Sequence, residues 1–502
     1  MSTVTFDAGT VTLERVREYV WEIPRQGEMR VPARVYASRR LLEEIAEDKS
    51  LEQLQNTTHL PGIQKYAIAL PDAHQGYGFP VGGVAGIDAE DGCISPGAIG
   101  YDINCGVRMV KTNLTYDDIR GHEEELVDAL FGAIPTGLGA GGVIENAPVE
   151  EILERGVEWA VEQGHGIESD LAHCEDEGYR PEANAAKVSG KAKDRGRNQV
   201  GSLGSGNHFL EVQRVTDVYR EEVAAEFGLD EDQIVVLIHC GSRGLGHQVC
   251  TDYLRDIEQT HQGLLSQLPD KELAAAPAGS QLADDYYEAM CAAINYAWVN
   301  RQLIMHRTRE VFAGVFDQHW EDLEMELLYD VAHNIGKKET HEIGVGPDGQ
   351  PADAVTEAVD SEETELYVHR KGATRAFPAG RPELPPAYSD VGQPILLPGS
   401  MGAGSYILRG GEKSLAETFG STAHGAGRLM SRTQAKSEYW GEDVMDDLRE
   451  QNHIYVRAES GATVAEEAPG VYKDVDEVVR VSDTLGIGDR VARTYPVCNI
   501  KG

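Results

Sequence analysis

The chain of 502 residues holds 84 Asp and Glu against 45 Lys and Arg, a formal net charge of -39 at pH 7. Acidic charge spread along the whole chain argues against a nucleic-acid partner in dilute salt. It does not exclude a local basic pocket for a phosphate chain in roughly molar salt, where the Debye length is about 3 Å. We interpret the acidity as a halophilic adaptation, with an ordinary acidic cytoplasmic protein as the alternative.

The cysteines and the amino terminus indicate the compartment. The seven cysteines have neither the even number nor the regular spacing of a disulfide framework, and no C-x-x-C pair indicates a structural zinc site. The amino terminus lacks a basic region followed by an apolar one, and no apolar run approaches the ~20 residues of a membrane helix. We therefore expect a reduced, cytoplasmic protein with no membrane association.

Taken in chain order, residues 1–60 alternate short strand-like and helical patterns, and Leu41, Leu42 and Ile45 recur at the spacing of a helix. The segments 261–285 and 346–365 carry no recognisable chemistry, and we predict that both are surface excursions. Neither a repeat nor a break in composition divides the chain. The sequence thus predicts one large, intertwined α/β domain over residues 1–502.

Several predicted strands deliver polar residues at their ends. Four apolar, strand-like runs each carry a histidine or a basic loop at or just past the end: "IVVLIHCGSRGLGHQ", "MELLYDVAHNIGKK", "ELYVHRKGATRAF" and "QPILLPGSMGAGSY". A fifth segment, "GSLGSGNHFLEVQ", places His208 where a glycine-rich loop enters an alternating strand. Rigid scaffolds usually place chemistry in loops at strand ends, so we expect the functional site there.

A metal centre is one reading of these residues. The stretch "GYDINCGVR" sets Asp102 beside Cys105, and thiolate, imidazole and carboxylate together suit zinc, iron, copper or manganese. One thiolate has enough lone pairs to serve two ions. A buried cysteine is more often a small apolar residue, and we accept that for Cys93, Cys240, Cys250, Cys291 and Cys498. The candidate ligands are Asp102, Cys105, His208, His239 and His333.

The stretch "STAHGAGRLMSRTQAK" predicts an anion site. Gly425 and Gly427 allow backbone N–H groups to approach a phosphate, and we predict a helix that starts near them. A neutral His424 there could attack phosphorus to form a phosphoramidate. A role in general acid/base catalysis or as a further metal ligand remains open. Neither H-E-x-x-H, G-x-x-x-x-G-K-[ST] nor K-x-D-G occurs, which disfavours a zincin protease, a P-loop protein and a lysine-type ligase.

Basic residues gather around the same motifs although the chain is acidic. A cluster of charge is usually a solvated face, but its coincidence with glycine loops and histidines favours a functional interpretation. The planar fork of arginine suits phosphate oxygens at an RNA end. These basic residues are Arg243, Lys371, Arg375, Arg428 and Arg432.

Taken together, the motifs closely resemble the RtcB family of GTP-dependent RNA ligases. The resemblance runs from about Pro71 to the last residue, in the order expected for the family. It implies a mixed-sheet α/β fold of the RtcB type with a central metal cleft. The motifs that carry it are "PDAHQGYGFPVGGV", "GYDINCGVR", "LGSGNHFLE", "IHCGSRGLGHQ", "DVAHNIGKK", "VHRKGATRAFPAG", "PGSMG", "STAHGAGR" and the terminal "IKG".

The resemblance implies a role for each matching residue. The five candidate ligands would hold two manganese ions with Cys105 as the bridge, and His424 would become guanylylated. Asp72 matches an acidic position near the metals, with a less definite role. The two glycines of the predicted anion site are expected near the nucleotide as well. Around the guanine nucleotide of GTP we expect Asn207, Glu211, Asn334, Ser400, Ser405, Gly425, Gly427, Tyr472 and Lys501. RNA phosphates would contact Arg243, Lys371 and Arg432.

The family mechanism gives these residues a sequence of steps. His424 attacks the α-phosphorus of GTP and pyrophosphate leaves. A 2',3'-cyclic phosphate on RNA is opened to a 3'-phosphate, which accepts GMP to give an RNA 3'-pp-5'-G end. The 5'-hydroxyl of a second RNA displaces GMP and leaves a phosphodiester. The resemblance implies tRNA exon halves as substrate in tRNA splicing, RNA repair as a further role, an archease-like activating partner and a monomer.

Two other functions stay open. A binuclear metal-dependent RNA-end phosphatase or cyclic phosphodiesterase would need the metal ligands but neither His424 nor Lys501. A non-catalytic RNA-binding protein would need none of them. The sequence also departs from the family in two places: Gly404 stands where alanine is typical, which we expect to loosen the loop, and Cys240 follows His239, which we expect to pack.

Overall fold

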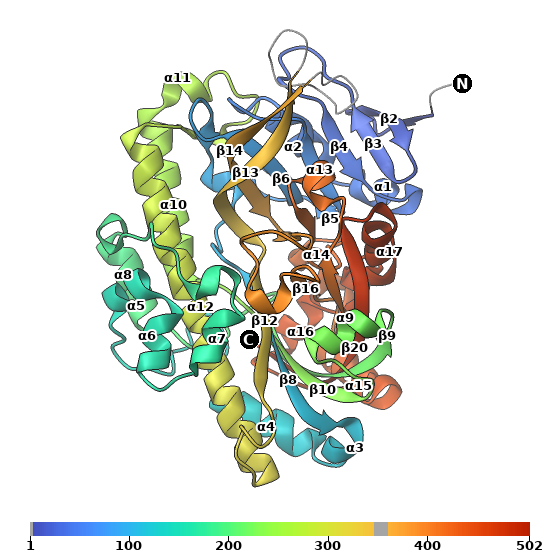
Figure 1. The fold of residues 1–502 in the computed structure, drawn as a ribbon. Helices are drawn as coiled ribbons and strands as arrows, with labels where there is room; N and C mark the ends of the chain where they lie inside the picture. Colours follow the sequence, from blue (N-terminus) through green and yellow to red (C-terminus); the bar gives the residue numbers. More distant parts are fainter. Residues whose placement is uncertain (1–3, 346–359) are drawn as a thin grey trace.

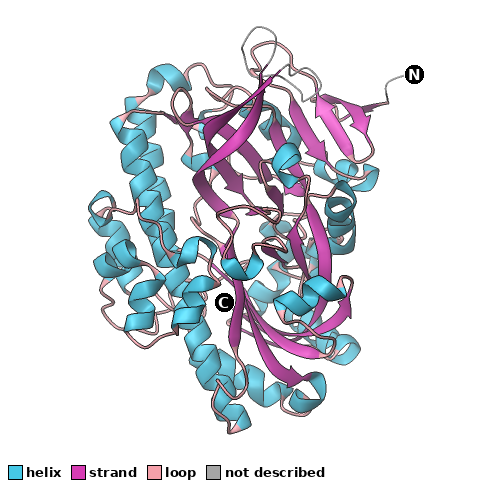
Figure 2. Ribbon diagram, viewed as in Figure 1, coloured by secondary structure: helices cyan, strands magenta, loops and turns pink. Residues whose placement is uncertain are grey.

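Two large mixed sheets form the centre of the molecule, with most helices outside them (Figures 1 and 2). This computed structural model describes residues 4–345 and 360–502. The predicted α/β class with mixed sheets is confirmed.

The first sheet combines strands from both halves of the chain. Its neighbours are antiparallel except β4 and β5, which are parallel. In spatial order the strands are β1 (Thr5–Asp7), β2 (Thr12–Arg17), β3 (Val20–Ile23), β4 (Ala33–Tyr36), β5 (Ala67–His74), β6 (Val81–Asp88), β14 (Asp360–Lys371) and β13 (Asn334–Val345).

The second sheet also combines strands from distant parts of the chain. In spatial order its strands are β12 (Glu326–Ala332), β8 (Gly106–Thr115), β10 (Gln233–Cys240), β9 (Phe209–Val218), β20 (Gly488–Lys501), β17 (Ser405–Gly410) and β16 (Pro394–Leu397), with β19 (Tyr455–Ala458) parallel to β20. Two short antiparallel pairs complete the strands: β7 (Cys93–Ile94) with β11 (Ala276–Pro277), and β15 (Ala373–Arg375) with β18 (Ser421–Ala423).

Helices surround the sheets. The helix predicted from Leu41, Leu42 and Ile45 is confirmed as α1, in which all three are buried and the Ser38 hydroxyl accepts from the Leu41 N–H. The helices are α1 (Arg39–Ile45), α2 (Ser50–Thr57), α3 (Tyr116–Ile119), α4 (Glu123–Ala133), α5 (Val149–Arg155), α6 (Val157–Glu162), α7 (Glu168–Ala172), α8 (Gly190–Arg197), α9 (Glu221–Phe227), α10 (Arg243–Thr260), α11 (Gln262–Leu265), α12 (Gln281–Phe316), α13 (Ser414–Thr418), α14 (Arg432–Glu438), α15 (Gly441–Asn452), α16 (Gly461–Glu466) and α17 (Val475–Leu485).

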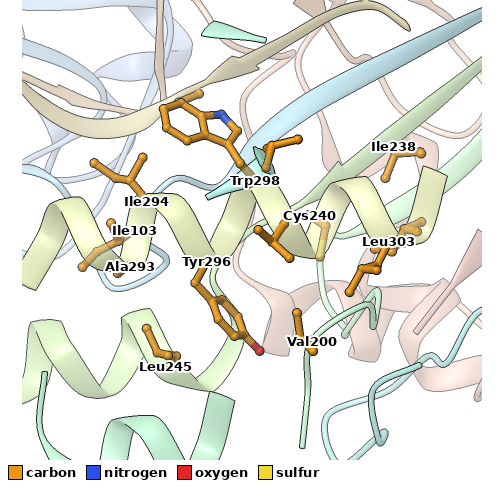
Figure 3. Close-up of a cluster of buried hydrophobic side chains, with 14 of the residues drawn as sticks. Ile103, Val200, Ile238, Cys240, Leu245, Ala293, Ile294, Tyr296, Trp298 and Leu303 are labelled. Carbon is orange, nitrogen blue, oxygen red and sulfur yellow. The ribbon is translucent and has the colours of Figure 1, made fainter. Parts of the chain in front are cut away.

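Helix α12, with 36 residues, is the longest element and runs through the core. It packs against α4, α5, α6, α10 and β10. Figure 3 shows Trp298 and Ile294 on one side of this helix and Tyr296 on the other. Every residue from 289 to 305 is buried, so other elements cover this part of the helix on all sides. Within residues 4–345 and 360–502, none of the helices is both long and apolar enough to cross a membrane.

Polar side chains of α12 hold the loops of the second sheet. The Arg301 guanidinium pairs with both oxygens of Asp330, at 2.8 and 2.7 Å, and donates to the carbonyls of Asn104 and Cys240 at 2.8 and 2.7 Å. Asn300 accepts from the N–H of Gly201 and donates to the carbonyl of Gly241. A buried charge requires such complete pairing, so these loops are tied to α12.

The segments predicted as excursions differ in their surroundings. Residues 261–285 begin with the exposed helix α11 and then turn inward, where the Ala274 carbonyl accepts from the Ser95 hydroxyl at 3.0 Å and β11 pairs with β7. Of 346–365, residues 346–359 lie outside the described residues, and Asp360–Glu365 form the mostly exposed start of β14.

Strands far apart in the sequence pair directly, as β6 with β14 and β9 with β20. Neither sheet can therefore be assembled from one half of the chain alone. On this ground we propose that residues 1–502 fold as one domain.

The buried helix gives a prediction about stability. Leu303→Ala removes a side chain that is 1% exposed and leaves a cavity beside α12, and we expect a loss of about 2–5 kcal/mol in the free energy of unfolding. Leu138 is 79% exposed, and Leu138→Ala is the matched control, with a change within about 0.5 kcal/mol. Denaturant titration at constant salt measures both. Equal effects would contradict a core role for α12.

Candidate active site

The five candidate metal ligands lie at strand ends and one turn of the second sheet. His239 is the last residue but one of β10 and lies beside Val107 and Phe209, His208 immediately precedes β9, and His333 follows β12. Asp102 and Cys105 occupy the turn that leads into β8. Since β8, β9, β10 and β12 are neighbours, residues far apart in the sequence arrive at one edge, as the strand-end pattern predicts.

The turn that carries Asp102 and Cys105 is fixed by its own backbone. The Cys105 N–H donates to the Asp102 carbonyl at 2.9 Å, and the Cys105 carbonyl accepts from the His333 N–H at 2.9 Å. Between them Asn104 has φ 54°, a left-handed conformation that asparagine tolerates, and its side chain donates to the Ile294 carbonyl of α12. The two ligand candidates are therefore held in place before any ion binds.

Side-chain atoms converge around the sulfur of Cys105. The Cys105 Sγ lies 3.4 Å from His208 Nε2 and 3.3 Å from His239 Nε2. His239 Nε2 lies 3.2 Å from His333 Nε2, and His208 Nε2 lies 2.8 Å from Asp102 Oδ2. These atoms form two groups that could each hold a metal ion, and the groups share Cys105.

The electrostatics suit cation binding. Burial lowers the pKa of His239 and of His333 well below the ordinary value, so both rings are neutral and keep a lone pair for a metal. Burial, with the charge of Asp102, raises the pKa of the Cys105 thiol to about 12, so binding must displace its proton. Burial alone would raise the pKa of Asp102, but His208 outweighs it and holds that pKa below its ordinary value. The donor set thus fits two cations that share one sulfur.

His424 lies beside this cluster, directly after β18. Its ring centroid is 4.8 Å from that of His333. Its Nδ1 lies 2.6 Å from Oδ2 of Asp72, a fully buried residue of β5, and the same oxygen accepts from the N–H of His424 at 3.0 Å and of Gly425 at 3.3 Å. A carboxylate on Nδ1 fixes the ring and leaves Nε2 as the reactive nitrogen, which is the arrangement of an activated nucleophile.

The glycines after His424 do not start a helix, contrary to the sequence prediction. Gly427 has φ 78°, and a Cβ there would lie 2.2 Å from the Asp72 carbonyl oxygen. The chain then pairs at Arg428 with Tyr472, and α14 begins only at Arg432, capped by the Ser431 hydroxyl. The close approach to the Asp72 backbone, instead of a helix start, explains the need for glycine at 427.

One pocket brings together most of the predicted nucleotide contacts. Those that line it are Asn207, Glu211, Asn334, Ser400, Gly425, Gly427, Tyr472 and Lys501, along with His239, His333 and His424. Ser405 is not among the lining residues: its buried hydroxyl accepts from the Gln213 side chain at 3.0 Å and from the Gly399 N–H at 3.3 Å.

The polar groups at the base of this pocket are strongly perturbed. Burial raises the pKa of Glu211 to about 7, and its carboxylate accepts from Gln213 and Asn499. Burial lowers the pKa of Lys501, whose ammonium group lies 3.7 Å from Glu467. Shifted, buried groups of this kind that face a cavity are typical of a ligand site.

Glu467 is a pocket residue that the sequence analysis missed. Its buried carboxylate accepts from the Tyr472 hydroxyl and pairs with Arg428 at 3.0 Å, Arg432 at 3.7 Å and Lys501 at 3.7 Å. It stands in "AEEAPG", outside every motif, and only the three-dimensional contacts reveal its position between these cations. It holds the basic residues of the pocket in place.

The residues predicted to bind RNA phosphates have different surroundings. Arg432 lines the pocket and donates to Asn207 at 3.5 Å. Arg243 lies behind the metal cluster, where it donates to the Ser202 hydroxyl and the Gly137 carbonyl, both at 3.2 Å. Lys371 also lines the pocket, but its buried ammonium group donates to the carbonyls of Tyr77, Phe79 and Gly97, and burial lowers its pKa to about 7.

The two departures from the family pattern have structural explanations. A Cβ at Gly404, which has φ 83°, would lie 2.4 Å from the Thr494 carbonyl oxygen, so the residue fits a tight turn. Cys240 is buried, its thiol donates to the Leu203 carbonyl at 3.0 Å, and it belongs to neither candidate metal group. This agrees with the expectation that Cys240 packs.

Fold and site together define a mixed α/β protein with a candidate two-ion centre beside a carboxylate-held histidine. The family model described as "tRNA-splicing ligase RtcB" matches residues 53–502. Proteins named tRNA-splicing ligase RtcB from Thermococcus kodakarensis, Archaeoglobus fulgidus and Methanococcus maripaludis are 52%, 50% and 47% identical to this chain, over 98% of it and 99% of each relative. The chain belongs to the RtcB family, as the resemblance predicts.

The shared sulfur gives a prediction about metal content. Cys105→Ala removes the sulfur common to both candidate groups. Changing a residue that only supports a metal ligand weakens metal binding by about 10- to 100-fold, so we expect the loss of this shared ligand to weaken it by more than about 100-fold. Elemental analysis of dialysed protein measures the bound metal. Cys250→Ala, which changes an equally buried cysteine outside both groups, is the control and retains metal. Equal metal in the two variants would make Cys105 structural.

Proposed function

We propose that this protein is an RNA ligase of tRNA splicing that joins a 2',3'-cyclic phosphate or 3'-phosphate end to a 5'-hydroxyl end, with GTP as cofactor. Family membership supports the ligase activity. The observation that carries the GTP-dependent step is the Asp72–His424 pair beside the shared metal groups.

His424 is proposed as the nucleophile on GTP. Its Nδ1–H donates to Asp72, so the lone pair on Nε2 attacks the α-phosphorus, a P–N bond forms and the bond to pyrophosphate breaks. The charge of Asp72 stabilises the ring as it becomes positive. GMP then passes from His424 to the RNA 3'-phosphate, which gives that phosphate a good leaving group for attack by the 5'-hydroxyl.

The base of the pocket supports guanine as the nucleobase. A guanine edge offers N–H donors beside a carbonyl acceptor, and Glu211 can accept while Lys501 donates. Adenine lacks this pattern. We propose that these two residues select GTP, with Asn207, Asn334, Ser400, Gly425, Gly427 and Tyr472 around the rest of the nucleotide and Ser405 supporting the loop from behind.

Two manganese ions are the proposed metals, held by Asp102, Cys105, His208, His239 and His333. Bound there, they would neutralise negative charge on phosphate oxygens. The protein residues contribute the pre-formed donor set, because Arg301 and Asn300 of α12 hold the turns that carry it.

For RNA, we propose phosphate contacts from Arg243, Arg432 and Lys371. Lys371 would give up hydrogen bonds to backbone carbonyls, so the two arginines are the stronger candidates. The substrate would be tRNA exon halves, with RNA repair as a further role. We also propose that the protein acts as a cytoplasmic monomer, activated by an archease-like protein.

Guanylylation separates the ligase from the rival phosphatase or cyclic phosphodiesterase. Incubated with manganese and GTP labelled at the α-phosphorus, the protein should acquire an acid-labile covalent label, and His424→Ala should abolish it, because a phosphoramidate on that ring carries the label. His319→Ala, at an exposed histidine, is the control and keeps the label. An unlabelled native protein would rule out the histidine–GMP route and favour the rival.

Nucleotide selection is a separate prediction. Glu211→Gln replaces an all-acceptor carboxylate by a group that also donates, and we expect the preference for GTP over ATP in labelling to fall by about tenfold or more. The ratio of the two labelling rates measures it. Glu438→Gln, an exposed position on α14, should leave the ratio unchanged. An unchanged ratio in Glu211→Gln would show that another group selects the base.

A further inference from the structure

Three aromatic rings form a row that leads outward from the wall of the pocket. The ring centroids of Tyr77 and Tyr101 are 5.6 Å apart with the planes at 65°, and those of Tyr101 and His247 are 4.8 Å apart at 27°, a stacked arrangement. Tyr101 lines the pocket and immediately precedes Asp102. The proposed function uses none of the three rings.

The row is held firmly at one end and open to solvent at the other. The Tyr77 carbonyl accepts from the buried Lys371 ammonium group at 2.7 Å, which fixes the loop after β5. Tyr77 and Tyr101 are half-buried, whereas His247, near the start of α10, is exposed. Among the described residues, Tyr101 is the one aromatic ring in contact with His247. The outer ring thus remains accessible to a further planar group.

Charge differs between the two ends of the row. Glu258 and Glu272 lie close enough to Tyr77 to raise its pKa further beyond the larger effect of burial. At the other end, Arg195 of α8 donates to the Gln248 side chain at 3.2 Å, next to His247 in the sequence, and Arg243 begins α10. A polyanion would therefore pass the His247 end and avoid the Tyr77 end.

Arg195 and Arg243 stand out in so acidic a chain. The 84 acidic residues outnumber the 45 Lys and Arg, yet among the described residues neither arginine forms an ion pair with a carboxylate. Arg195 is exposed. An exposed guanidinium without an acidic partner, next to a row of aromatic rings, suits a chain that alternates phosphates with planar bases.

We propose that Tyr101 and His247 form a nucleobase-stacking subsite for a single-stranded RNA whose end lies at the metal cluster, and that Arg195 holds a phosphate of the same strand. Tyr77, which packs edge-on against Tyr101, positions that ring. The proposal rests on the proposed function in that RNA is the substrate. Every base has a planar face, so such a subsite accepts any sequence. Stacking also lets a protein of net charge -39 gain part of its affinity for RNA from contacts that do not depend on positive charge.

Direct binding tests the subsite. With single-stranded RNA carrying a 5'-hydroxyl and a fluorophore, at fixed salt and without GTP, His247→Ala should raise the Kd by about tenfold, the loss expected for one base stack. His247→Phe should restore the affinity because it restores the planar face. His122→Ala changes another exposed histidine, which packs against Phe316, and should bind as the native protein does. The unfolding midpoint of each variant confirms that it is folded.

Arg195→Ala tests the phosphate contact. It should weaken binding and reduce the slope of log K against log salt by about one unit, whereas His247→Ala should leave that slope unchanged. A slope that stays the same in Arg195→Ala would remove this residue from the subsite.

Abasic RNA identifies the stacked base. Replacing terminal nucleotides one at a time by abasic sites should weaken binding of the native protein at one position, and His247→Ala should be insensitive at that position. Native affinity in His247→Ala, or failure of His247→Phe to restore it, would overturn the subsite. RNA binding without any joining in the complete assay would overturn the proposed function and leave the subsite in place. Joining by His247→Ala at the native rate would overturn the subsite and leave the proposed function in place.

Discussion

The buried pair between Arg301 and Asp330 is the interaction on which the site depends. Both side chains are fully buried, and the guanidinium also takes the carbonyls of Asn104 and Cys240, each next to a candidate metal ligand. Removing Asp330 would leave Arg301 uncompensated in the core, together with Arg108, which lies 2.7 Å from the same carboxylate. Losing that charge is far more costly than losing a surface pair. The long helix therefore serves as the support from which the strand-end residues are positioned.

A second constraint joins the beginning of the chain to its end. Asp72 comes from the first sheet, His424 follows a short strand near the carboxyl-terminal part, and Lys501 lies in the last strand of the second sheet. The proposed nucleophile, the carboxylate that orients it and the base of the pocket thus meet only when both sheets have formed. In Figure 1 the carboxyl-terminal end of the chain lies near the centre of the molecule.

Much of the site could be predicted, because its residues stand in short motifs at strand ends. Asp102, Cys105 and His424 were found in this way, and the family resemblance assigned their roles. Local pattern failed where distant contacts decide the structure. Gly427 was expected to open a helix, but it is required by the Asp72 backbone, and Glu467 stands in no motif although it pairs with three cations. Such contacts depend on tertiary packing, which spacing along the chain does not encode.

The charge of the chain and its proposed substrate are compatible because of where the charges lie. Most arginines of this protein are neutralised by nearby carboxylates, as Arg428 is by Glu467. Among the described residues, Arg195 and Arg243 are exceptions, and the rings of Tyr101 and His247 add a contact that salt does not screen. Stacking of bases keeps its strength at high ionic strength, whereas phosphate contacts weaken. An acidic surface that works in concentrated salt would therefore favour an RNA site in which aromatic contact carries a large share of the binding.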